Sequence, residues 1–338
     1  MNNTFDKLVT EYFGNYLPIQ SGFSQRTIEN YRDTFLLLFK YQETELGKRI
    51  DQITMDTFSI ELIQGFLSWI EDERGCSTAT RNQRLSAIHS FMRFVQYRCP
   101  EHLSTCNRIL GIKFKKTAAK TMNYLTVDAL RLLLRMPNQR TAQGLRDLAL
   151  MSLIYDSGAR VQEVIDLKIS SFLWMNANVI SLYGKGRKER KVPITKEAVS
   201  VVNTYLAGLP TAYRNDPHHA LFFNKQGSGL TRAGVGYILR KYFQQAKQLD
   251  PGLFPSTISP HSLRHSKAMH LLEAGVNFIY IRDLLGHVSV TTTEVYAKAN
   301  PEIKRRAIEK VSMQIVTEDK TNLEEKENLS TWLRTQIG

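Results

Sequence analysis

The most constraining feature of the chain is the stretch from His261 to Tyr296, which combines helical periodicity with closely spaced polar side chains. Apolar residues in its first half recur at the spacing of one helix face, namely Leu263, Met269, Leu271 and Leu272. On such a helix His261 and Arg264 project together, because they lie three positions apart. A second helix is predicted to end at Gly286, since glycine takes the left-handed conformation that terminates helices. His287 follows directly, and Tyr296 lies nine residues farther on. The imidazoles of His261 and His287, the guanidinium of Arg264 and the phenol of Tyr296 together indicate a site that handles a phosphate.

A second group of polar residues begins at Arg160. A glycine interrupts the apolar helix before it, Arg160 opens the next helix, and Glu163 lies three residues on, where its carboxylate can hold the guanidinium. Farther along, the stretches 179–183 and 192–194 predict the two strands of a hairpin. Lys185 stands between two glycines in the connecting turn. It is therefore expected to be a mobile positive charge at the hairpin tip.

The chain carries a large excess of positive charge. Lysine and arginine number 45 against 32 acidic residues, a formal net charge of +13, which favours a polyanionic partner. Nucleic acid is favoured over a membrane, because the sequence has no apolar run of about 18 residues. The alternative is a basic protein without such a partner. The 338 residues, 42% of them hydrophobic, suffice for two domains with ordinary cores.

Cysteine and histidine usage indicates neither a disulfide framework nor a metal site. The three cysteines lack CxxC spacing, and the adjacent His218 and His219 have no cysteine near them in the sequence. The start of the chain is polar and does not resemble a secretory signal. We therefore expect a reduced cytoplasmic protein, associated with the nucleoid, that uses no metal or other cofactor.

Capping residues mark the beginnings of further predicted helices. These helices are expected after Ser24, after Thr54–Phe58, and after Ser77, Thr126, Thr195 and Thr231. The segment Leu221–Phe223 is a candidate short strand. Tyr155 and Tyr280 fall within apolar helical patterns and are expected in the core, and His89 is expected to be a buried histidine with a satisfied hydrogen bond. His265 and His270 suggest no role.

At six positions the chain resembles the tyrosine recombinase (phage integrase) family: Arg160, Lys185, His261, Arg264, His287 and Tyr296. The local contexts are SGAR with a glutamate three residues on, GKG followed by KER and VP, HSLRH, LGH, and a tyrosine nine residues past that histidine. Each motif alone is weak, whereas all six in order form a strong signal. The resemblance covers roughly residues 120–300, and the helical pattern extends it over the N-terminal half.

The resemblance implies a mainly α fold with a small β-sheet. Residues 1–107 would form an N-terminal SAM-like helical core-binding domain, and residues 124–316 the tyrosine recombinase catalytic domain. Residues 108–123 would be a basic linker. Residues 317–338 would be a tail with a short helix that docks on a neighbouring protomer or on its own domain.

The family resemblance also implies the chemistry. Tyr296 would attack the phosphorus of DNA and form a 3′-phosphotyrosine, which conserves the energy of the bond, so that rejoining needs neither metal nor ATP. Arg160 and Arg264 would hold the non-bridging oxygens. Lys185 would be the general acid for the 5′ oxygen. Of the histidines, His261 would accept the tyrosine proton or orient the site and His287 would donate a hydrogen bond to phosphate, while Glu163 would orient Arg160.

DNA contacts are predicted on three segments of the chain. Residues assigned to them are Arg81 and Arg84 on a helix of the first domain, Lys113, Lys115 and Lys116 in the linker, and Arg187 and Lys188 in the hairpin. For the two helical arginines, a solvated surface without DNA is the alternative.

The resulting prediction is a site-specific recombinase that exchanges strands of double-stranded DNA through a Holliday junction, as a homo-tetramer joined by exchange of C-terminal helices. Its expected role is DNA integration or transposition of a mobile element. The alternatives are an Xer-type resolvase of chromosome or plasmid dimers, a type IB topoisomerase, and a sequence-specific DNA-binding protein without catalysis.

Overall fold

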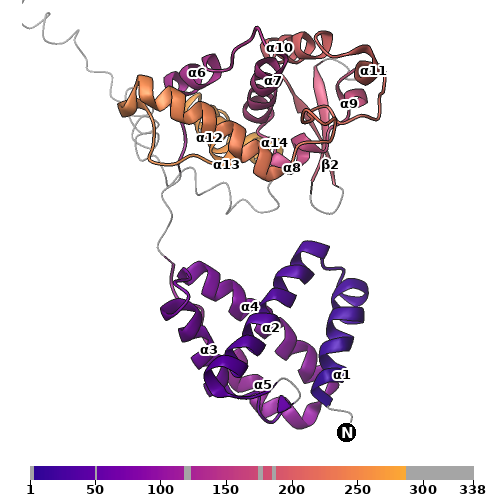
Figure 1. The fold of residues 1–338 in the computed structure, drawn as a ribbon, viewed down its shortest axis with the longest axis vertical. Helices are drawn as coiled ribbons and strands as arrows, with labels where there is room; N and C mark the ends of the chain where they lie inside the picture. The colour runs from indigo at the N-terminus through magenta and orange to yellow at the C-terminus, as the bar shows by residue number, and fades with distance from the viewer. Residues whose placement is uncertain (1–3, 50–51, 118–122, 174–177, 185–187, 287–338) are drawn as a thin grey trace, which may run out of the picture. The chain divides into compact units, whose positions relative to one another are not determined.

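The computed structural model describes residues 4–49, 52–117, 123–173, 178–184 and 188–286, and the chain divides into two compact units, Met1–Lys120 and Thr121–Gly338 (Figure 1). The predicted boundaries at 107 and 124 remain predictions. A helix that was not predicted, α5 (Leu103–Leu110), runs past residue 107 into the segment expected to be a linker.

The described part of the first unit is helical. Its elements are α1 (Thr4–Glu11), the π-helical segment η1 (Tyr12–Gln20), α2 (Gln25–Leu46), α3 (Ile60–Asp72), α4 (Thr78–Arg98), the 3₁₀ turn η3 (Pro100–His102) and α5. The predicted helix beginnings at Ser24 and Ser77 are confirmed, because each hydroxyl accepts a backbone N–H of the first turn, at 3.3 Å in both cases. Ser59 caps α3 in the same way, at 3.2 Å.

Aromatic side chains fill the core of this unit. Phe91 of α4 lies at the centre, with its ring centroid 5.1 Å from that of Phe35 on α2 and 6.1 Å from that of Phe5 on α1. All three side chains are buried. His89 is buried as predicted, and its Nε2 lies 3.0 Å from the carbonyl oxygen of Ile109 on α5. Packing of this kind gives the first unit a core of its own.

The described part of the second unit is mostly helical with a small two-stranded sheet. Its elements are α6 (Val127–Arg135), α7 (Ala142–Ser157), α8 (Val161–Ile165), α9 (Ile169–Leu173), β1 (Val179–Tyr183), β2 (Glu189–Pro193), α10 (Lys196–Ala207), α11 (Thr211–Arg214), α12 (Arg232–Leu249), the 3₁₀ turn η5 (Pro251–Leu253), α13 (Pro260–Glu273) and α14 (Phe278–Leu285). The mainly α fold with a small sheet is therefore confirmed. In the described part of the chain, no helix is long and apolar enough to cross a membrane.

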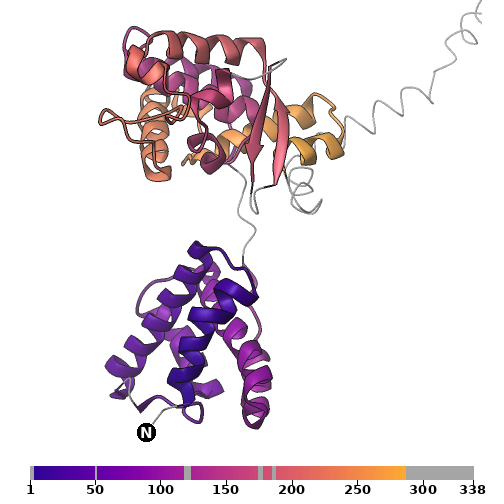
Figure 2. The same ribbon diagram turned by 90° about the vertical axis from the view of Figure 1, so that its right-hand side faces the viewer.

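The two strands form the predicted hairpin. β1 and β2 pair antiparallel, from Val179 opposite Pro193 to Tyr183 opposite Glu189, and Figure 2 shows them side by side. The amide of Gly184 donates to the carbonyl oxygen of Lys188 at 2.9 Å, which closes the ladder before the turn. The tip itself, with Lys185, lies outside the described residues.

The helix α7 lies in the middle of the second unit, where it packs against α10 and α13. Its inward side chains Leu150, Leu153 and Ile154 are fully buried, as expected for a helix covered by neighbours. The predicted caps Thr126, Thr195 and Thr231 are confirmed at the beginnings of α6, α10 and α12.

Two expectations for the second unit were wrong. Leu221–Phe223 is not a strand, because the chain makes only isolated bridges at Ala220 and Phe223 and then reverses in a turn in which Gly227 donates to Asn224. Tyr280 is not in the core: it is 70% exposed, since α14 directs the neighbouring Ile281 inward. Successive residues of a helix point about 100° apart, so one inward residue leaves its neighbour outside.

Candidate active site

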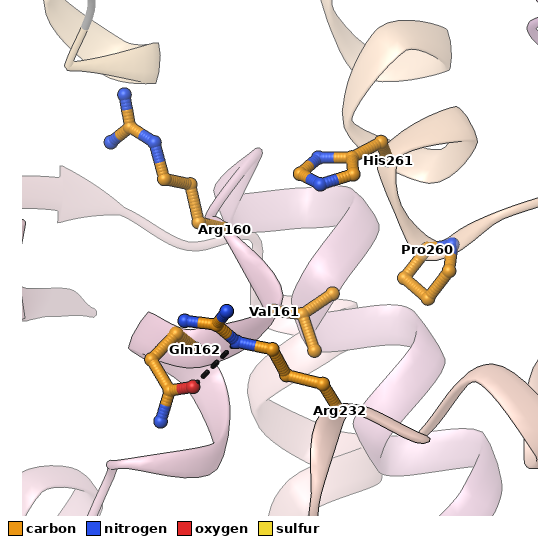
Figure 3. Close-up of a pocket in the computed structure, with 6 residues that line it drawn as sticks. All are labelled: Arg160, Val161, Gln162, Arg232, Pro260 and His261. Atoms are coloured by element: carbon orange, nitrogen blue, oxygen red, sulfur yellow. Dashed lines mark hydrogen bonds between the residues drawn. The ribbon is translucent and has the colours of Figure 1, made fainter. Parts of the chain in front are cut away.

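Three of the six predicted catalytic residues lie in the described part of the second unit. Arg160 precedes the first residue of α8, and His261 and Arg264 lie in the first two turns of α13. Lys185, His287 and Tyr296 lie outside the described residues, so their positions stay predictions. Figure 3 shows Arg160 and His261 on opposite sides of one pocket, with the imidazole directed towards the arginine.

The pocket has a volume of about 330 Å³ and is lined by Arg160, Val161, Gln162, Arg232, Pro260 and His261 (Figure 3). This lining contains two guanidinium groups and one imidazole but no carboxylate. Such a combination concentrates positive potential and suits an anion.

Arg264 is buried and joins the ends of two helices. Its side chain donates from Nη1 to the carbonyl oxygen of Gly158 at 2.7 Å and from Nη2 to that of Leu285 at 2.6 Å. Gly158 ends α7, and Leu285 is the last residue of α14. Carbonyl groups at helix ends lack intrahelical partners, and they carry partial negative charge. They therefore satisfy a buried guanidinium and fix its orientation.

Arg160 is less buried than Arg264 and is held at both terminal nitrogens. Nη1 donates to Oε1 of Glu163 at 3.0 Å and Nη2 to the carbonyl oxygen of Gly286 at 3.0 Å. Glu163 also accepts the backbone N–H of Arg160 at 2.8 Å through Oε2. The contact matches the one expected from their spacing in the sequence. The Arg160 side chain is 37% exposed, which leaves part of the guanidinium open to the pocket.

Sequence reasoning missed the role of Arg190. From β2, this arginine makes two parallel hydrogen bonds to Glu163, Nη1 to Oε1 at 2.8 Å and Nη2 to Oε2 at 2.6 Å, and its Nε donates to the carbonyl oxygen of Leu284 at 3.0 Å. Glu163 thus holds two arginines at once. The signal for it was the strand alternation, which places Arg190 on the same face as the buried Val192.

Glu163 is ionised in this network. Burial alone would raise the pKa of its carboxyl group, but the hydrogen bonds and charge of Arg190, together with those of Arg160, outweigh burial and hold the pKa below its usual value. The carboxylate side chain is only 3% exposed. One buried negative charge therefore fixes the guanidinium of Arg160 relative to the hairpin.

Two glycines permit the close approach of these elements. Gly158 and Gly286 both have left-handed backbone conformations, with φ of +58° and +64°. A Cβ on Gly158 would lie 2.9 Å from Cδ2 of Leu285, and a Cβ on Gly286 would lie 3.0 Å from Cδ of Arg190. The carbonyl groups that hold Arg264 and Arg160 thus lie at helix ends whose left-handed backbone and close packing favour glycine.

The histidines of α13 are held in the neutral form. Desolvation, followed by the positive charges of Arg264, Arg160 and Arg232, lowers the pKa of His261. Burial and the neighbouring His261 and Arg264 lower the pKa of His265 to about 4. A neutral His261 has a free lone pair and can accept a proton at neutral pH.

His270 has a structural explanation that the sequence did not reveal. Its Nε2 lies 2.9 Å from the carbonyl oxygen of Leu125, and its Nδ1 lies 3.0 Å from the hydroxyl of Tyr155. Because a carbonyl only accepts, Nε2 carries the proton and Nδ1 accepts from the tyrosine. Tyr155 is therefore engaged in packing α7 against α13.

The predicted DNA-binding arginines of α4 point into their own unit. Arg81 is 6% exposed and donates from Nη1 to the carbonyl oxygen of Lys113 at 3.2 Å. Arg84 donates to the carbonyl oxygen of Asn30 at 3.1 Å and to Oγ1 of Thr34 at 3.0 Å. Arg81 is buried and Arg84 is partly buried, and phosphate contact by them stays a prediction.

The predicted lysines differ from these arginines in exposure. Lys113, Lys115, Lys116 and Lys188 are exposed, and Arg187 lies outside the described residues. Lys115 pairs with Glu71 at 2.5 Å. Among the residues that the structure describes, no group of three or more histidine, cysteine, aspartate or glutamate side chains is placed to hold a metal ion.

Comparison with known proteins connects both units to one family. Residues 123–302 match the phage integrase family, and residues 10–98 match the N-terminal SAM-like domain of phage integrases. The protein y4rC of Sinorhizobium fredii, which is named as an integrase/recombinase, is 35% identical over 90% of this chain and 91% of its own length. The tyrosine recombinase XerD of Oceanobacillus iheyensis is 33% identical over 85% of this chain and 92% of its own.

Solved structures show the same fold. The integrase of the Tn1549 transposon, in complex with a circular intermediate DNA, has a TM-score of 0.67 at 16% identity and covers 89% of this chain and 99% of its own. The XerH site-specific recombinase, bound to a palindromic difH substrate, has a TM-score of 0.62 at 23% identity and covers 86% and 80%. From the family match over residues 123–302 and these relatives, the chain is a member of the phage integrase family, the tyrosine recombinases.

Proposed function

We propose that this protein is a site-specific recombinase that cleaves and rejoins double-stranded DNA with Tyr296 as its nucleophile. The observation that carries the proposal is the convergence of Arg160 and Arg264 on the ends of α7 and α14, beside His261 and a pocket whose lining has no carboxylate. Fixed guanidinium groups suit a phosphorane, because they need no rearrangement as its negative charge develops.

In the proposed reaction, the phenolic oxygen of Tyr296 attacks phosphorus and the bond from phosphorus to the 5′ oxygen breaks. His261 accepts the phenolic proton or orients the site, and Lys185 gives a proton to the departing oxygen, so that the products are a 3′-phosphotyrosine and a free 5′ hydroxyl. The reverse attack by a 5′ hydroxyl rejoins DNA without ATP, and no step calls for a metal.

The remaining predicted residues have supporting roles in the proposal. His287 donates a hydrogen bond to a phosphate oxygen, and Glu163 keeps Arg160 in place through contacts of 2.8 and 3.0 Å. The exposed Lys113, Lys116 and Lys188 are available for backbone phosphates of the duplex. The net charge of +13 supports a DNA partner. A cytoplasmic protein associated with the nucleoid is part of the proposal.

We propose that the active form is a homo-tetramer on two paired recombination sites, joined by exchange of the C-terminal helices, and that strands exchange pairwise through a Holliday junction. The relatives named above that were solved with DNA support a DNA-bound assembly. Integration or transposition of a mobile element is the preferred role, in keeping with relatives named as an integrase/recombinase and a transposon integrase. Resolution of chromosome or plasmid dimers is the second candidate, in keeping with the XerD relative.

The nucleophile is tested with a nicked duplex in which cleavage releases a short fragment and traps the covalent intermediate. Duplexes from DNA flanking the gene are incubated with the wild type and with Tyr296→Phe, and a denaturing gel is read for a protein–DNA adduct. We expect an adduct with the wild type and none with the variant. Binding by the wild type without an adduct on any duplex would favour a non-catalytic DNA-binding protein.

A second assay separates recombination from topoisomerase activity. A supercoiled plasmid with two copies of the cleaved site gives recombined products with a recombinase, and only relaxed circles with a type IB topoisomerase. Deletions between direct repeats but no joining of separate molecules would favour a dimer resolvase over an integrase.

A further inference from the structure

Arg232 occupies an unusual position for a surface arginine. It is the first residue of α12 and lines the same pocket as Arg160 and His261. Its Nε donates to Oε1 of Gln162 at 2.6 Å. Among the described residues, neither terminal nitrogen of Arg232 donates to a protein acceptor, and no carboxylate pairs with it.

The contact with Gln162 fixes the direction of this guanidinium without neutralising it. Gln162 donates from Nε2 to Oδ1 of Asp166 at 2.7 Å, so its amide oxygen is left to accept from Arg232. A neutral amide thus stands between the arginine and the nearest acid of this network. The N-terminus of α12 adds positive potential at the same place.

The guanidinium groups of Arg160 and Arg232 are directed to different parts of the pocket. Figure 3 shows the guanidinium of Arg160 extending away from the Gln162–Arg232 pair, with His261 across the pocket. Gathering like charges in this way is unfavourable unless an anion binds between or beside them. A DNA strand offers a series of such anions at regular spacing.

We propose that Arg232 binds a second backbone phosphate, adjacent to the cleaved one in the same DNA strand, and so sets the register of that strand on Arg160 and His261. This proposal rests on the proposed function, since it takes the Arg160 pocket as the place of the cleaved phosphate. Arg232 is a positioning residue: it touches DNA but not the reacting atoms.

The test combines variants with single uncharged phosphates. Binding of the nicked duplex, and of duplexes with one methylphosphonate at successive positions around the nick, is measured for the wild type and Arg232→Ala over a series of NaCl concentrations. We expect Arg232→Ala to bind about 10-fold more weakly and to lower the slope of log K against log salt by about 1. One methylphosphonate beside the cleavage position should weaken DNA binding by the wild type by the same factor of about 10. The same substitution should leave DNA binding by Arg232→Ala unchanged.

Three further variants separate phosphate binding from a structural contact. Arg240→Ala removes the same charge from the exposed face of α12, outside the pocket lining, and should keep the wild-type response to that methylphosphonate. Arg232→Lys retains the charge and should keep the salt slope. Gln162→Ala removes the tether between α8 and α12 and should also keep the slope, with a smaller loss of affinity.

The proposal is overturned if Arg232→Ala responds to every methylphosphonate as the wild type does, or if Gln162→Ala reproduces its loss of affinity and slope. Adduct formation on the same duplex is the separate readout for the proposed function. If the wild type forms the adduct but Arg232→Ala responds to every methylphosphonate as the wild type does, only the second phosphate site is rejected. A wild type that binds none of the duplexes would reject both.

Discussion

At the scale of single residues, the site depends on how few negative charges it contains. Glu163 is the shared partner of Arg160 and Arg190, and its carboxylate oxygens accept from both guanidinium groups at 2.6 to 3.0 Å. Arg264, by contrast, is held by backbone carbonyls at the ends of α7 and α14. Because one carboxylate serves two arginines, the pocket keeps a net positive charge for an anion.

Replacing Glu163 with Gln should damage stability and activity together. Removing one partner of a buried ion pair typically costs about 3 kcal/mol, because the remaining charge is left uncompensated. The folded pKa of Glu163 is lowered, so its contribution is present above the ordinary carboxyl pKa of 4.5 and is lost as pH falls through the lower folded value. Urea unfolding should therefore show a wild-type advantage at pH 7 that shrinks below pH 4.5. An equal loss in the exposed Glu197→Gln would contradict this explanation.

His265 should make the protein less stable in mild acid. Its pKa is lowered from 6.5 to about 4, so the unfolded chain takes up the proton first as pH falls. Stability is then lost between about pH 6.5 and 4, by up to about 3 kcal/mol in total. We expect His265→Gln to reduce this pH dependence, as measured by urea unfolding at pH 7.5 and 5. An unchanged dependence would assign it to other groups.

At the scale of elements, the site is assembled where helices stop. The helices α7 and α14 both end at glycines in left-handed conformation, and the carbonyls beside these ends bind Arg264 and Arg160. The hairpin strand β2 adds Arg190, which contacts the carbonyl oxygen of Leu284 near the same end of α14. The geometry of the two arginines therefore depends on the helix terminations rather than on the helix interiors.

Gly286→Ala should impair DNA cleavage more than it lowers stability. A side chain at φ +64° costs about 1 kcal/mol, and the added Cβ would also meet Cδ of Arg190 at 3.0 Å. Gly275→Ala is a matched control, because Gly275 has φ of +79° but nothing within 4 Å of an added Cβ. Adduct formation should fall at least tenfold for Gly286→Ala and remain near wild type for Gly275→Ala. Equal activities would show that the approach of Arg190 is unimportant.

At the scale of the whole molecule, each unit has its own core. The first contains a cluster of aromatic rings around Phe91 among its aliphatic residues, while the second is built around the aliphatic face of α7. The predicted catalytic residues that the structure describes belong to the second unit, whereas the exposed Lys113 and Lys116 belong to the first.

The two units should fold as separate fragments. We expect residues 1–120 and 121–338, expressed apart, to give circular dichroism spectra that sum to that of the full chain, with cooperative unfolding of each. The second fragment should form the adduct at a reduced rate, because it lacks the phosphate contacts proposed for the first unit. A fragment that is unfolded by itself would show that the boundary at residue 120 does not separate independent domains.

The sequence by itself determined the family, the helix beginnings at Ser24, Ser77, Thr126, Thr195 and Thr231, the hairpin, and the pairing of Arg160 with Glu163. These are local features, because caps, strand alternation and contacts three residues apart depend on neighbours along the chain. Two predictions were wrong, namely that Tyr280 lies in the core and that Leu221–Phe223 forms a strand. Both features depend on packing against distant segments rather than on neighbours along the chain.

Only the tertiary structure decided which residues meet from distant segments. Arg190 reaches Glu163 across 27 positions and Arg160 reaches Gly286 across 126 positions, separations at which no periodicity relates two residues. The contacts of Arg81 and Arg84 could not be predicted for the same reason, because their acceptors on Lys113 and Asn30 come from distant segments. Periodicity reports the face on which a side chain lies, whereas its partner is set by how the helices pack.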